Sequence, residues 1–400
     1  MMSVLSAGVV TAVGHRVAET AASVASGICR YRATKLIGTR PKPIVAAPVL
    51  PLGPDLEGAV RGMRLARPAL AECVGSGAGE GGRMALILCT RHRAFPMPPP
   101  PRLSLFDDLE RLDQAWRPLV ELVCAELEQV HGIVVAPEHR IELARGQAGG
   151  LAALSLAEEL LASGAVERCL VGGVEGACEA RTLEWLDLRA AIDAPGAPAI
   201  VSGDAAAFVL LGPERPERVG LEGSFRPGTT EPGGALAAAA LDLVERARAR
   251  GIRVSTLLCD LNGERRRALA HSVAMLRAFG PDVPARSEPV GSFGDVGAAW
   301  GSVALALGAH LAARAGQAVL CMGSSYDERP AQELAAASVR AATEMLGHTA
   351  AAVDTGSVRR EGPVAPASTT EVLVQGQGDL HASALLTPPS RGSREATEGT

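Results

Sequence analysis

Residues 141–150 read Ile141-Glu142-Leu143-Ala144-Arg145-Gly146-Gln147-Ala148-Gly149-Gly150, and this stretch decides the fold together with the residues that follow it. Apolar residues from Leu151 to Leu161 recur at three- and four-residue spacing, which predicts a helix. The run Cys169 to Val171, closed by Gly172-Gly173, predicts a short buried strand. The resulting order is strand, tight turn, helix, strand, and Gln147 falls in the turn that opens the helix.

The position of Gln147 is chemically notable because a helix N-terminus carries a partial positive charge. A thiol at this point would ionise more easily than a free cysteine, which suits covalent acyl chemistry. The amide of Gln147 cannot act as that nucleophile.

Strands and helices are predicted to alternate along the rest of the chain, which favours an α/β fold. Short apolar runs are typical of strands buried on both faces of a sheet. The predicted strands are 84–89, 254–259 and 318–322, and the predicted helices are 106–130, 236–249, 265–279, 300–315 and 330–346.

The stretch around Gln147 resembles the nucleophile elbow of the thiolase superfamily, above all that of the β-ketoacyl-acyl-carrier-protein synthases. Their version reads Ala-Cys-x-x-Gly before the helix and Ala-Gly-Gly-x-Glu after the next strand. Counting back from Gly172-Gly173 places Gln147 at the cysteine position and Gly150 at the elbow glycine, where it would line the substrate pocket.

Other landmarks of this family occur in the expected order and extend the resemblance over most of residues 3 to 325. They are the opening strand and turn Ala7 to Gly14, the helix end Ser26-Gly27-Ile28, the strand Gly203 to Leu210, and the loop Pro289 to Ala299.

The resemblance also implies two catalytic histidines, which would donate hydrogen bonds to the thioester oxygen as an enolate forms. Asn262 stands at the first histidine position and Gly294 at the second, with Phe293 and Asp295 beside it. Phe293 is expected either to line or to plug the acyl pocket, as is Trp300. The loss of one such donor typically costs about 100- to 1000-fold in rate, so chain elongation by the ordinary route is not expected.

The family resemblance implies a five-layer α-β-α-β-α fold built from two similar halves. We expect an N-terminal half over residues 1–212 and a C-terminal half over 213–348. Residues 349–400 are rich in Ser, Thr, Pro and Gly and are predicted to form a disordered tail, which would be inert or would tether a partner. Proteins of this fold dimerise, and the strand from Arg168 to Glu175 is expected near the interface.

Composition excludes several classes of function. The net charge of −5 gives no general attraction to nucleic acid or to anionic membranes. No stretch of about 20 residues is apolar enough to span a bilayer, so neither membrane insertion nor secretion is expected. The eight cysteines and eight histidines show no metal-ligand spacing, and no cofactor is implied. The cysteines are interpreted as reduced, mostly buried thiols in a cytoplasmic protein.

Several of these residues also have simpler structural interpretations. Asn262 and Glu264 would replace the missing donors with a different chemistry, or would cap a helix that starts near Arg265. Asp295 would act as a base, or would cap the helix after it. The run Arg265 to Arg267 would meet an acidic carrier protein or form a solvated helix face, and three consecutive helix residues cannot all face one ligand.

Three interpretations of Gln147 stay open at this point. It would hold a malonyl thioester for decarboxylation, as in glutamine-bearing loading ketosynthases. It would fill the pocket, as in chain length factors. Or it would mark a site that has lost its function. Two hypotheses follow. The first is a noncatalytic subunit that forms either a homodimer or a heterodimer with an active ketosynthase. The second is an enzyme that acts on acyl or malonyl thioesters of an acyl carrier protein.

Overall fold

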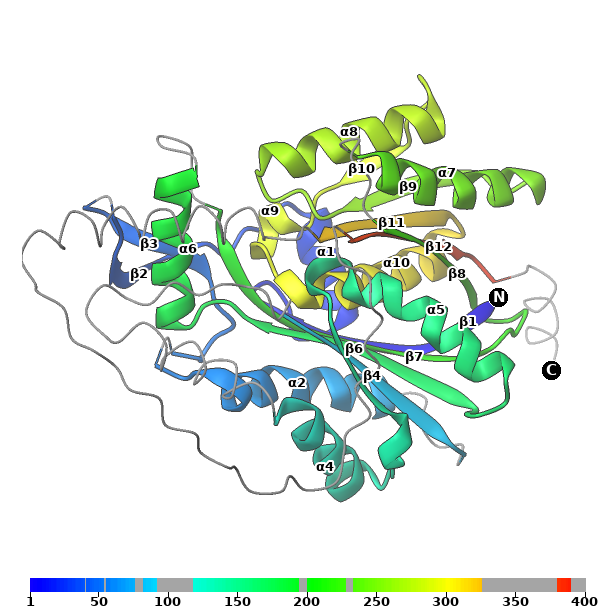
Figure 1. Cartoon of the computed structure of the whole chain (residues 1–400), viewed down its shortest axis with the longest axis horizontal. Coiled ribbons are helices and arrows are strands. Elements are labelled where there is room, and N and C mark those ends of the chain that lie inside the picture. The colour runs from blue at the N-terminus through cyan, green and yellow to red at the C-terminus, as the bar shows by residue number, and fades with distance from the viewer. Residues whose placement is uncertain are drawn as a thin grey trace, which may run out of the picture.

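The computed structural model describes residues 1–39, 41–53, 55–75, 82–91, 118–193, 200–227, 233–325 and 380–389. Two helical layers cover the outside of two sheets, and a third helical layer lies between the sheets (Figure 1). This is the five-layer α/β arrangement expected from the family resemblance.

The first sheet consists of strands from the N-terminal part of the chain, in the order β5-β4-β6-β7-β1. The first three of these strands are parallel to one another, whereas β7 is antiparallel to both β6 and β1. The strands are β1 (Met2–Thr11), β4 (Met84–Thr90), β5 (Arg140–Ala144), β6 (Arg168–Gly176) and β7 (Ser202–Pro213).

The second sheet repeats this pattern in the order β10-β9-β11-β12-β8. Again three strands are parallel, and again the fourth is antiparallel to both of its neighbours. Three residue pairs between β1 and β8 join the two sheets. The strands are β8 (Val219–Pro227), β9 (Val254–Cys259), β10 (Ala285–Ser287), β11 (Ala318–Ser325) and β12 (Leu380–Thr387).

The central layer contains α1 (Val17–Ala25), α5 (Gly149–Ala162) and α10 (Trp300–Ala315), which pack between the inner faces of the two sheets. The helices α5 and α10 touch through glycines. A Cβ atom on Gly150 would lie 2.6 Å from the amide nitrogen of Ser302, and one on Gly301 would lie 2.6 Å from the Cα of Gly150. Neither position tolerates a side chain, so this contact fixes the N-terminus of α5 against the N-terminus of α10.

The outer layers are also amphipathic helices, each with its own apolar core against a sheet. The first sheet is covered by α2 (Gly58–Gly75) and α4 (Leu119–His131), and the second by α7 (Gly234–Ala249) and α8 (Arg265–Phe279). The remaining elements are β2 (Arg32–Ile37), β3 (Pro43–Ala47), α6 (Ala180–Asp193), α9 (Val290–Phe293) and the 3₁₀ turns η1 (Pro137–His139), η2 (Gly146–Ala148) and η3 (Gly297–Ala299).

Most elements lie where the sequence pattern places them. The strand 254–259 and the helices 265–279 and 300–315 have the expected bounds, while α7 begins two residues before the predicted 236. The predicted helix 106–130 is described only from Leu119, and the predicted helix 330–346 lies outside the described residues. The division of the chain at 212/213 stays a prediction.

The disordered tail was a wrong prediction for residues 380–387. They form β12, which lies between β11 and β8 and pairs with both over its whole length. Its residues from His381 to Thr387 are buried. Local composition could not reveal this strand, because its stability comes from two neighbours distant in sequence.

The segment Arg168 to Glu175 belongs to β6, which pairs with β4 on one side and β7 on the other. All nine residues of β6 are buried within the chain. Its position near a dimer interface stays a prediction.

Candidate functional site

Gln147 lies in η2, the single 3₁₀ turn between the end of β5 and the first residue of α5. The turn is held from the second sheet by Ser325, at the end of β11. The Ser325 hydroxyl accepts a hydrogen bond from the Ala148 N–H over 2.8 Å and donates one to the Arg145 carbonyl over 2.6 Å. The elbow predicted from the sequence therefore exists, with the glutamine at its tip.

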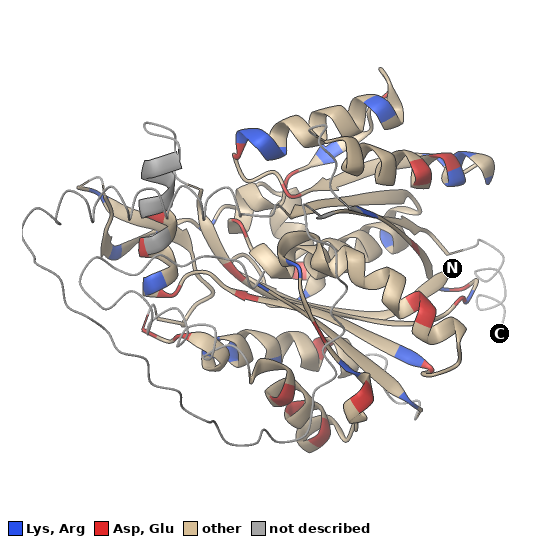
Figure 2. Cartoon of the chain, in the orientation of Figure 1, with Lys and Arg blue, Asp and Glu red and all other residues tan. Residues whose placement is uncertain are grey.

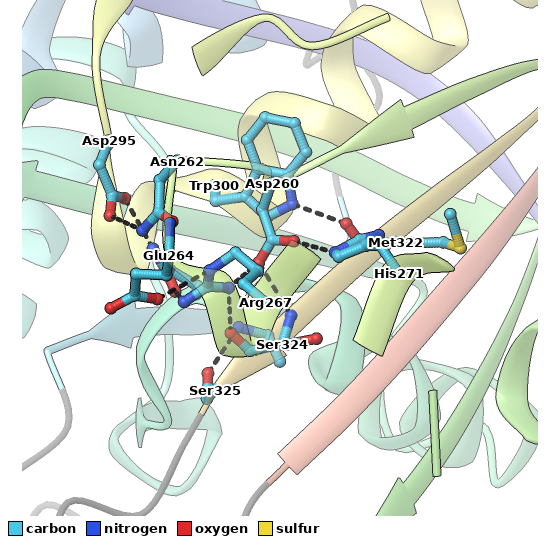
Figure 3. Close-up of polar contacts among 12 residues, drawn as sticks. Asp260, Asn262, Glu264, Arg267, His271, Asp295, Trp300, Met322, Ser324 and Ser325 are labelled. Atoms are coloured by element: carbon cyan, nitrogen blue, oxygen red, sulfur yellow. Dashed lines mark hydrogen bonds and ion pairs between the residues drawn. The ribbon is translucent and has the colours of Figure 1, made fainter. Parts of the chain in front are cut away.

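Gln147 and Asn262 meet at one carboxylate, that of Asp295. The Gln147 amide donates from Nε2 to Asp295 Oδ1 over 2.6 Å. The Asn262 amide donates from Nδ2 to Asp295 Oδ2 over 2.7 Å, a contact drawn in Figure 3. Gln147, at the predicted cysteine position, and Asn262, at the predicted position of the first histidine, thus lie close together in space. Asp295, which follows Gly294 at the predicted position of the second histidine, joins them.

Asn262 and Asp295 also bind backbone groups close to the starts of α8 and η3. Asn262 Oδ1 accepts the backbone N–H of Glu264 over 3.0 Å, directly before α8, and Asp295 Oδ1 accepts that of Gly297 over 3.0 Å, at the start of η3. The prediction that Asn262, Glu264 and Asp295 cap these elements is nevertheless wrong, because the N-cap residues are Glu264 and Val296 and neither element has a side-chain cap hydrogen bond.

Arg267 holds the other end of the Gln147 amide. Its guanidinium donates to Gln147 Oε1 and to Asp260 Oδ2, and also to the Ser324 carbonyl over 2.6 Å and to Glu264 Oε2 over 3.1 Å. Arg267 is only 3% exposed. The solvated helix face is therefore correct for Arg265 and Arg266, which are exposed, but wrong for Arg267.

Asp260 is a buried carboxylate at the end of β9, and sequence reasoning missed its role. Its Oδ1 lies 2.5 Å from His271 Nε2, and its Oδ2 accepts the Ser324 N–H over 2.9 Å (Figure 3). Burial alone would raise the pKa of Asp260, but Arg267, His271 and the Ser324 N–H together hold it below its ordinary value. The signal in the sequence was an acid directly after a buried strand, followed seven and eleven residues later by Arg267 and His271.

Gly294 cannot easily be replaced by the histidine of the family. Its φ is +80°, in the region that disfavours residues with a Cβ. A Cβ there would lie 2.9 Å from the Val201 carbonyl oxygen and 3.0 Å from the Gly203 amide nitrogen. The backbone at this position therefore requires glycine and leaves no room for a side-chain donor.

The two residues predicted to line a pocket are both closely packed. Gly150 lies in the contact between α5 and α10, where its backbone touches Gly301 and Ser302. Phe293 is fully buried in the central core, as is Trp300, whose indole N–H donates to the Met322 carbonyl over 3.0 Å. The assignment of Gly150 and Phe293 to an acyl pocket stays a prediction.

No described thiol is suited to replace the missing nucleophile. Cys89 comes closest to the elbow, since a Cβ on Gly149 would lie 3.7 Å from its sulfur. Burial raises the pKa of Cys89 to about 12, so the thiolate is not populated near neutral pH. Cys169, Cys259 and Cys321 are buried core residues as predicted, and the seven buried cysteines and the exposed Cys29 are all free thiols.

A second buried ionic cluster lies behind the elbow and contains Glu175, the acid of the Gly-Gly-x-Glu motif. Arg91 pairs with Glu175 and, over 3.0 Å, with Glu179. Glu175 Oε2 also accepts the Ala298 N–H over 3.3 Å. Burial raises the pKa of Glu175 although Arg91 opposes this. The contact to Ala298 ties β6 to η3 and so supports the loop that carries Asp295.

The site can therefore offer hydrogen bonds and negative charge, but not a nucleophilic thiolate. Two carboxylates, those of Asp260 and Glu264, pair with the guanidinium of Arg267, and Gln147 links that guanidinium to the carboxylate of Asp295. No group of three or more His, Cys, Asp or Glu residues in the described ranges is arranged to hold a metal ion. In the same part of the chain, no helix is long and apolar enough to cross a membrane.

Comparison with known proteins gives a clear answer at the level of the fold. No protein-family model matches the sequence, and no curated protein matches it either. Solved structures do match. The ishigamide ketosynthase/chain length factor has a TM-score of 0.63 at 18% identity, over 97% of this chain and 99% of that one.

Two further structures support the same assignment over 97% of this chain and 99% of theirs. One is AntDE:AntF, a type II polyketide synthase acyl-carrier protein in complex with its ketosynthase, with a TM-score of 0.64 at 13% identity. The other is a β-ketoacyl synthase from Burkholderia phymatum STM815, with a TM-score of 0.58 at 14% identity. The chain has the thiolase-like fold of the ketosynthases and chain length factors.

Proposed function

We propose that this protein is a noncatalytic ketosynthase-like subunit that acts as a dimeric partner in fatty-acid or polyketide metabolism. One observation carries the proposal: Gln147 Nε2 and Asn262 Nδ2 both donate to the carboxylate of Asp295. These amides are the groups that stand where the family has its cysteine and its first histidine.

The consequence for chemistry follows from charge. Condensation and decarboxylation both develop negative charge on a thioester oxygen, which needs preorganised hydrogen-bond donors. Here one donor from each amide is already directed to an anion, and Gly294 adds no side chain. A malonyl carboxylate would also meet Asp295, a like charge, inside a site with a low effective dielectric constant.

An open strand edge supports dimer formation. The strand β5 ends three residues before Gln147 and pairs only with β4, so it forms one end of the first sheet within the described residues. An unpaired edge is a ready site for pairing with another chain. We infer that a partner subunit would pair with the β5 edge, in the same sheet as β6.

The partner type is suggested by the solved structures. The ishigamide structure, by its name, pairs a ketosynthase with a chain length factor, and a second similar structure is a ketosynthase in complex with its chain length factor from Xenorhabdus doucetiae. The latter has a TM-score of 0.54 at 15% identity, over 81% of this chain and 94% of that one. The alternative, an acyltransferase or malonyl-thioester decarboxylase, has Gln147 in its favour, but one N–H of the Gln147 amide and one of the Asn262 amide already donate to Asp295.

Co-expression with each ketosynthase of the same genome tests the proposal. We expect one of them to co-purify and to sediment as a heterodimer, and we expect its product length or rate to change when this chain is omitted. A chain that sediments as a monomer at micromolar concentration, alone and with every ketosynthase, would contradict the proposal.

A further inference from the structure

Residues 20–54 contain no aspartate and no glutamate, although the whole chain has 44 acidic residues and a net charge of −5. The same stretch contains both lysines of the chain, Lys35 and Lys42, and three arginines, Arg30, Arg32 and Arg40. Positive charge is therefore concentrated in one segment of an otherwise acidic protein.

The structure places this segment on the surface as the hairpin of β2 and β3. Arg30, Arg32, Lys35 and Lys42 are all exposed, and none of them forms an ion pair with another described residue. On the second sheet, by contrast, Arg246 and Arg250 pair with Asp242 and Glu222. Figure 2 shows blue segments on the hairpin and no red on its strands.

The outward face of the hairpin carries apolar side chains on either side of the exposed Lys35. Ala33 pairs with Val45 and Ile37 with Pro43 across the two strands, so these four side chains share one face. Ile37 is 64% exposed and Val45 is 42% exposed. The opposite face packs Leu36 and Ile44 against a small core around Leu183. The outward face, defined by Ala33, Ile37, Pro43 and Val45, therefore has no cover within the described residues.

The hairpin is attached directly to the loop that carries Asp295. The Arg30 N–H donates to the Ser292 carbonyl over 3.1 Å, and the Tyr31 hydroxyl donates to the Val290 carbonyl over 2.9 Å. Further along, β3 pairs with β7 at Ser202 and Gly203, and the Gly203 N–H donates to the Asp295 carbonyl over 2.8 Å. Both ends of the hairpin are therefore anchored to the segment 290–295, which carries Asp295.

An apolar centre with a charged rim is the usual anatomy of a protein interface. A nucleic-acid surface would need a continuous basic stripe, and this chain has an isoelectric point of about 6.0. A lysine on an open edge also protects against aggregation. That role needs one charge, whereas four exposed cations in this segment have no ion-pair partner among the described residues.

We propose that the β2–β3 hairpin is a docking surface for an acidic protein, namely an acyl carrier protein. Its acidic residues would pair with Arg32, Lys35 and Lys42, and an apolar side chain between them would cover Ile37 and Val45. The choice of a carrier protein rests on the function proposed above, whereas the preference for an acidic protein rests on the hairpin alone.

Binding of a holo acyl carrier protein to the full chain, measured by calorimetry at low and at high salt, tests this inference. We expect the triple variant Arg32→Glu, Lys35→Glu, Lys42→Glu to weaken binding by at least about tenfold, because like charges then face each other. The control is Arg64→Glu, Arg253→Glu, Arg314→Glu, which changes net charge equally at three exposed arginines outside the hairpin. We expect the control to stay within about threefold of the wild type, since distant exposed charges are screened.

A charge-neutral pair of variants tests the apolar part of the surface. Ile37→Ser with Val45→Ser should weaken carrier-protein binding by about tenfold without changing its salt dependence, because buried apolar area is lost. Circular dichroism checks that each variant is folded.

Three results would overturn the inference. The first is equal weakening of binding by the two triple variants, and the second is undetectable binding of the carrier protein to the wild type. The third is hairpin-dependent binding to anionic vesicles or duplex DNA in place of the carrier protein. The chain could also bind the carrier protein through the hairpin and yet form a dimer with no ketosynthase. That result would retain this inference and reject the proposed function.

Discussion

Asp295 accepts a hydrogen bond from the side-chain amide of Gln147 over 2.6 Å, although the two residues are 148 positions apart in the sequence. The same carboxylate accepts the amide of Asn262 over 2.7 Å, and Arg267 holds the far end of Gln147. Both ends of the Gln147 amide are thus held by other groups of the protein. These contacts connect η2, which leads out of the first sheet, with α8 and the loop of Asp295.

Removing the guanidinium of Arg267 should strongly destabilise the fold. Asp260 would then be a buried carboxylate with only His271 and the Ser324 N–H as partners, and breaking a buried pair typically costs about 3–5 kcal/mol. Arg267→Met should therefore lower the free energy of unfolding in urea by an amount in this range. The matched variant Arg265→Met, at an exposed position of the same helix, should change it by no more than about 0.5 kcal/mol. Similar values for the two variants would mean that Arg267 is not buried.

The low pKa of Asp260 predicts a pH dependence with a definite sign. A carboxyl group whose folded-state pKa lies below its unfolded value of about 3.9 stabilises the fold above that value, and this contribution is lost as the pH falls through the folded-state pKa. Asp260→Asn should therefore be much less stable than the wild type at pH 7, and the difference should shrink at pH 3. The pKa of Glu175 is raised, so Glu175 changes the stability with pH in the opposite direction. Because Glu175 is present in both the wild type and Asp260→Asn, its effect cancels when the two are compared. An unchanged difference between the two pH values would reject the assignment.

Restoring the nucleophile should not restore condensation. In Gln147→Cys the thiol would lie beside the carboxylate of Asp295, and Gly294 would still provide no donor. We expect neither this variant nor Gln147→Cys combined with Asn262→His to condense malonyl and acyl carrier proteins at more than about one hundredth of the rate of an active ketosynthase. Mass spectrometry of the carrier-bound products provides the measurement. A rate within tenfold of the active enzyme in the double variant would show that the scaffold is still competent.

The strand β12 can be tested with two leucines. Leu385 is fully buried in the core beneath α7 and α8, whereas Leu276 is 67% exposed. Leu385→Ala should cost about 2–5 kcal/mol of unfolding free energy, and Leu276→Ala should cost no more than about 0.5 kcal/mol. Equal effects would favour the disordered tail that composition predicts.

The sequence predicted the fold well because its signals are local or periodic. The helices 265–279 and 300–315 were found from apolar spacing, and the elbow was found from the order of strand, turn and helix around Gln147. The strand 380–387 was missed because its pattern is short and its surroundings are polar. The repeated topology shows why the strand is needed. In the first sheet β7 lies between β6 and β1, and β12 takes the corresponding place between β11 and β8 in the second sheet.

The candidate site was predicted only in part. The positions of Gln147, Asn262 and Gly294 followed from the family resemblance, but their contacts did not. Arg267 looked like one of three solvent-exposed arginines, because helical periodicity alone does not tell which of three neighbours faces inward. Its burial depends on Asp260, and that pairing becomes visible only when β9 and α8 are placed together.

The central claim is that the elbow of this protein supports neither decarboxylation nor acyl transfer because its amides are bound to Asp295. The most direct test is mass spectrometry of malonyl and acyl carrier proteins after incubation with the purified, folded chain and with its Gln147→Ala variant. We predict that neither protein converts malonyl to acetyl or takes up an acyl group. Conversion by the wild type that is lost in Gln147→Ala would contradict the account and establish a decarboxylase.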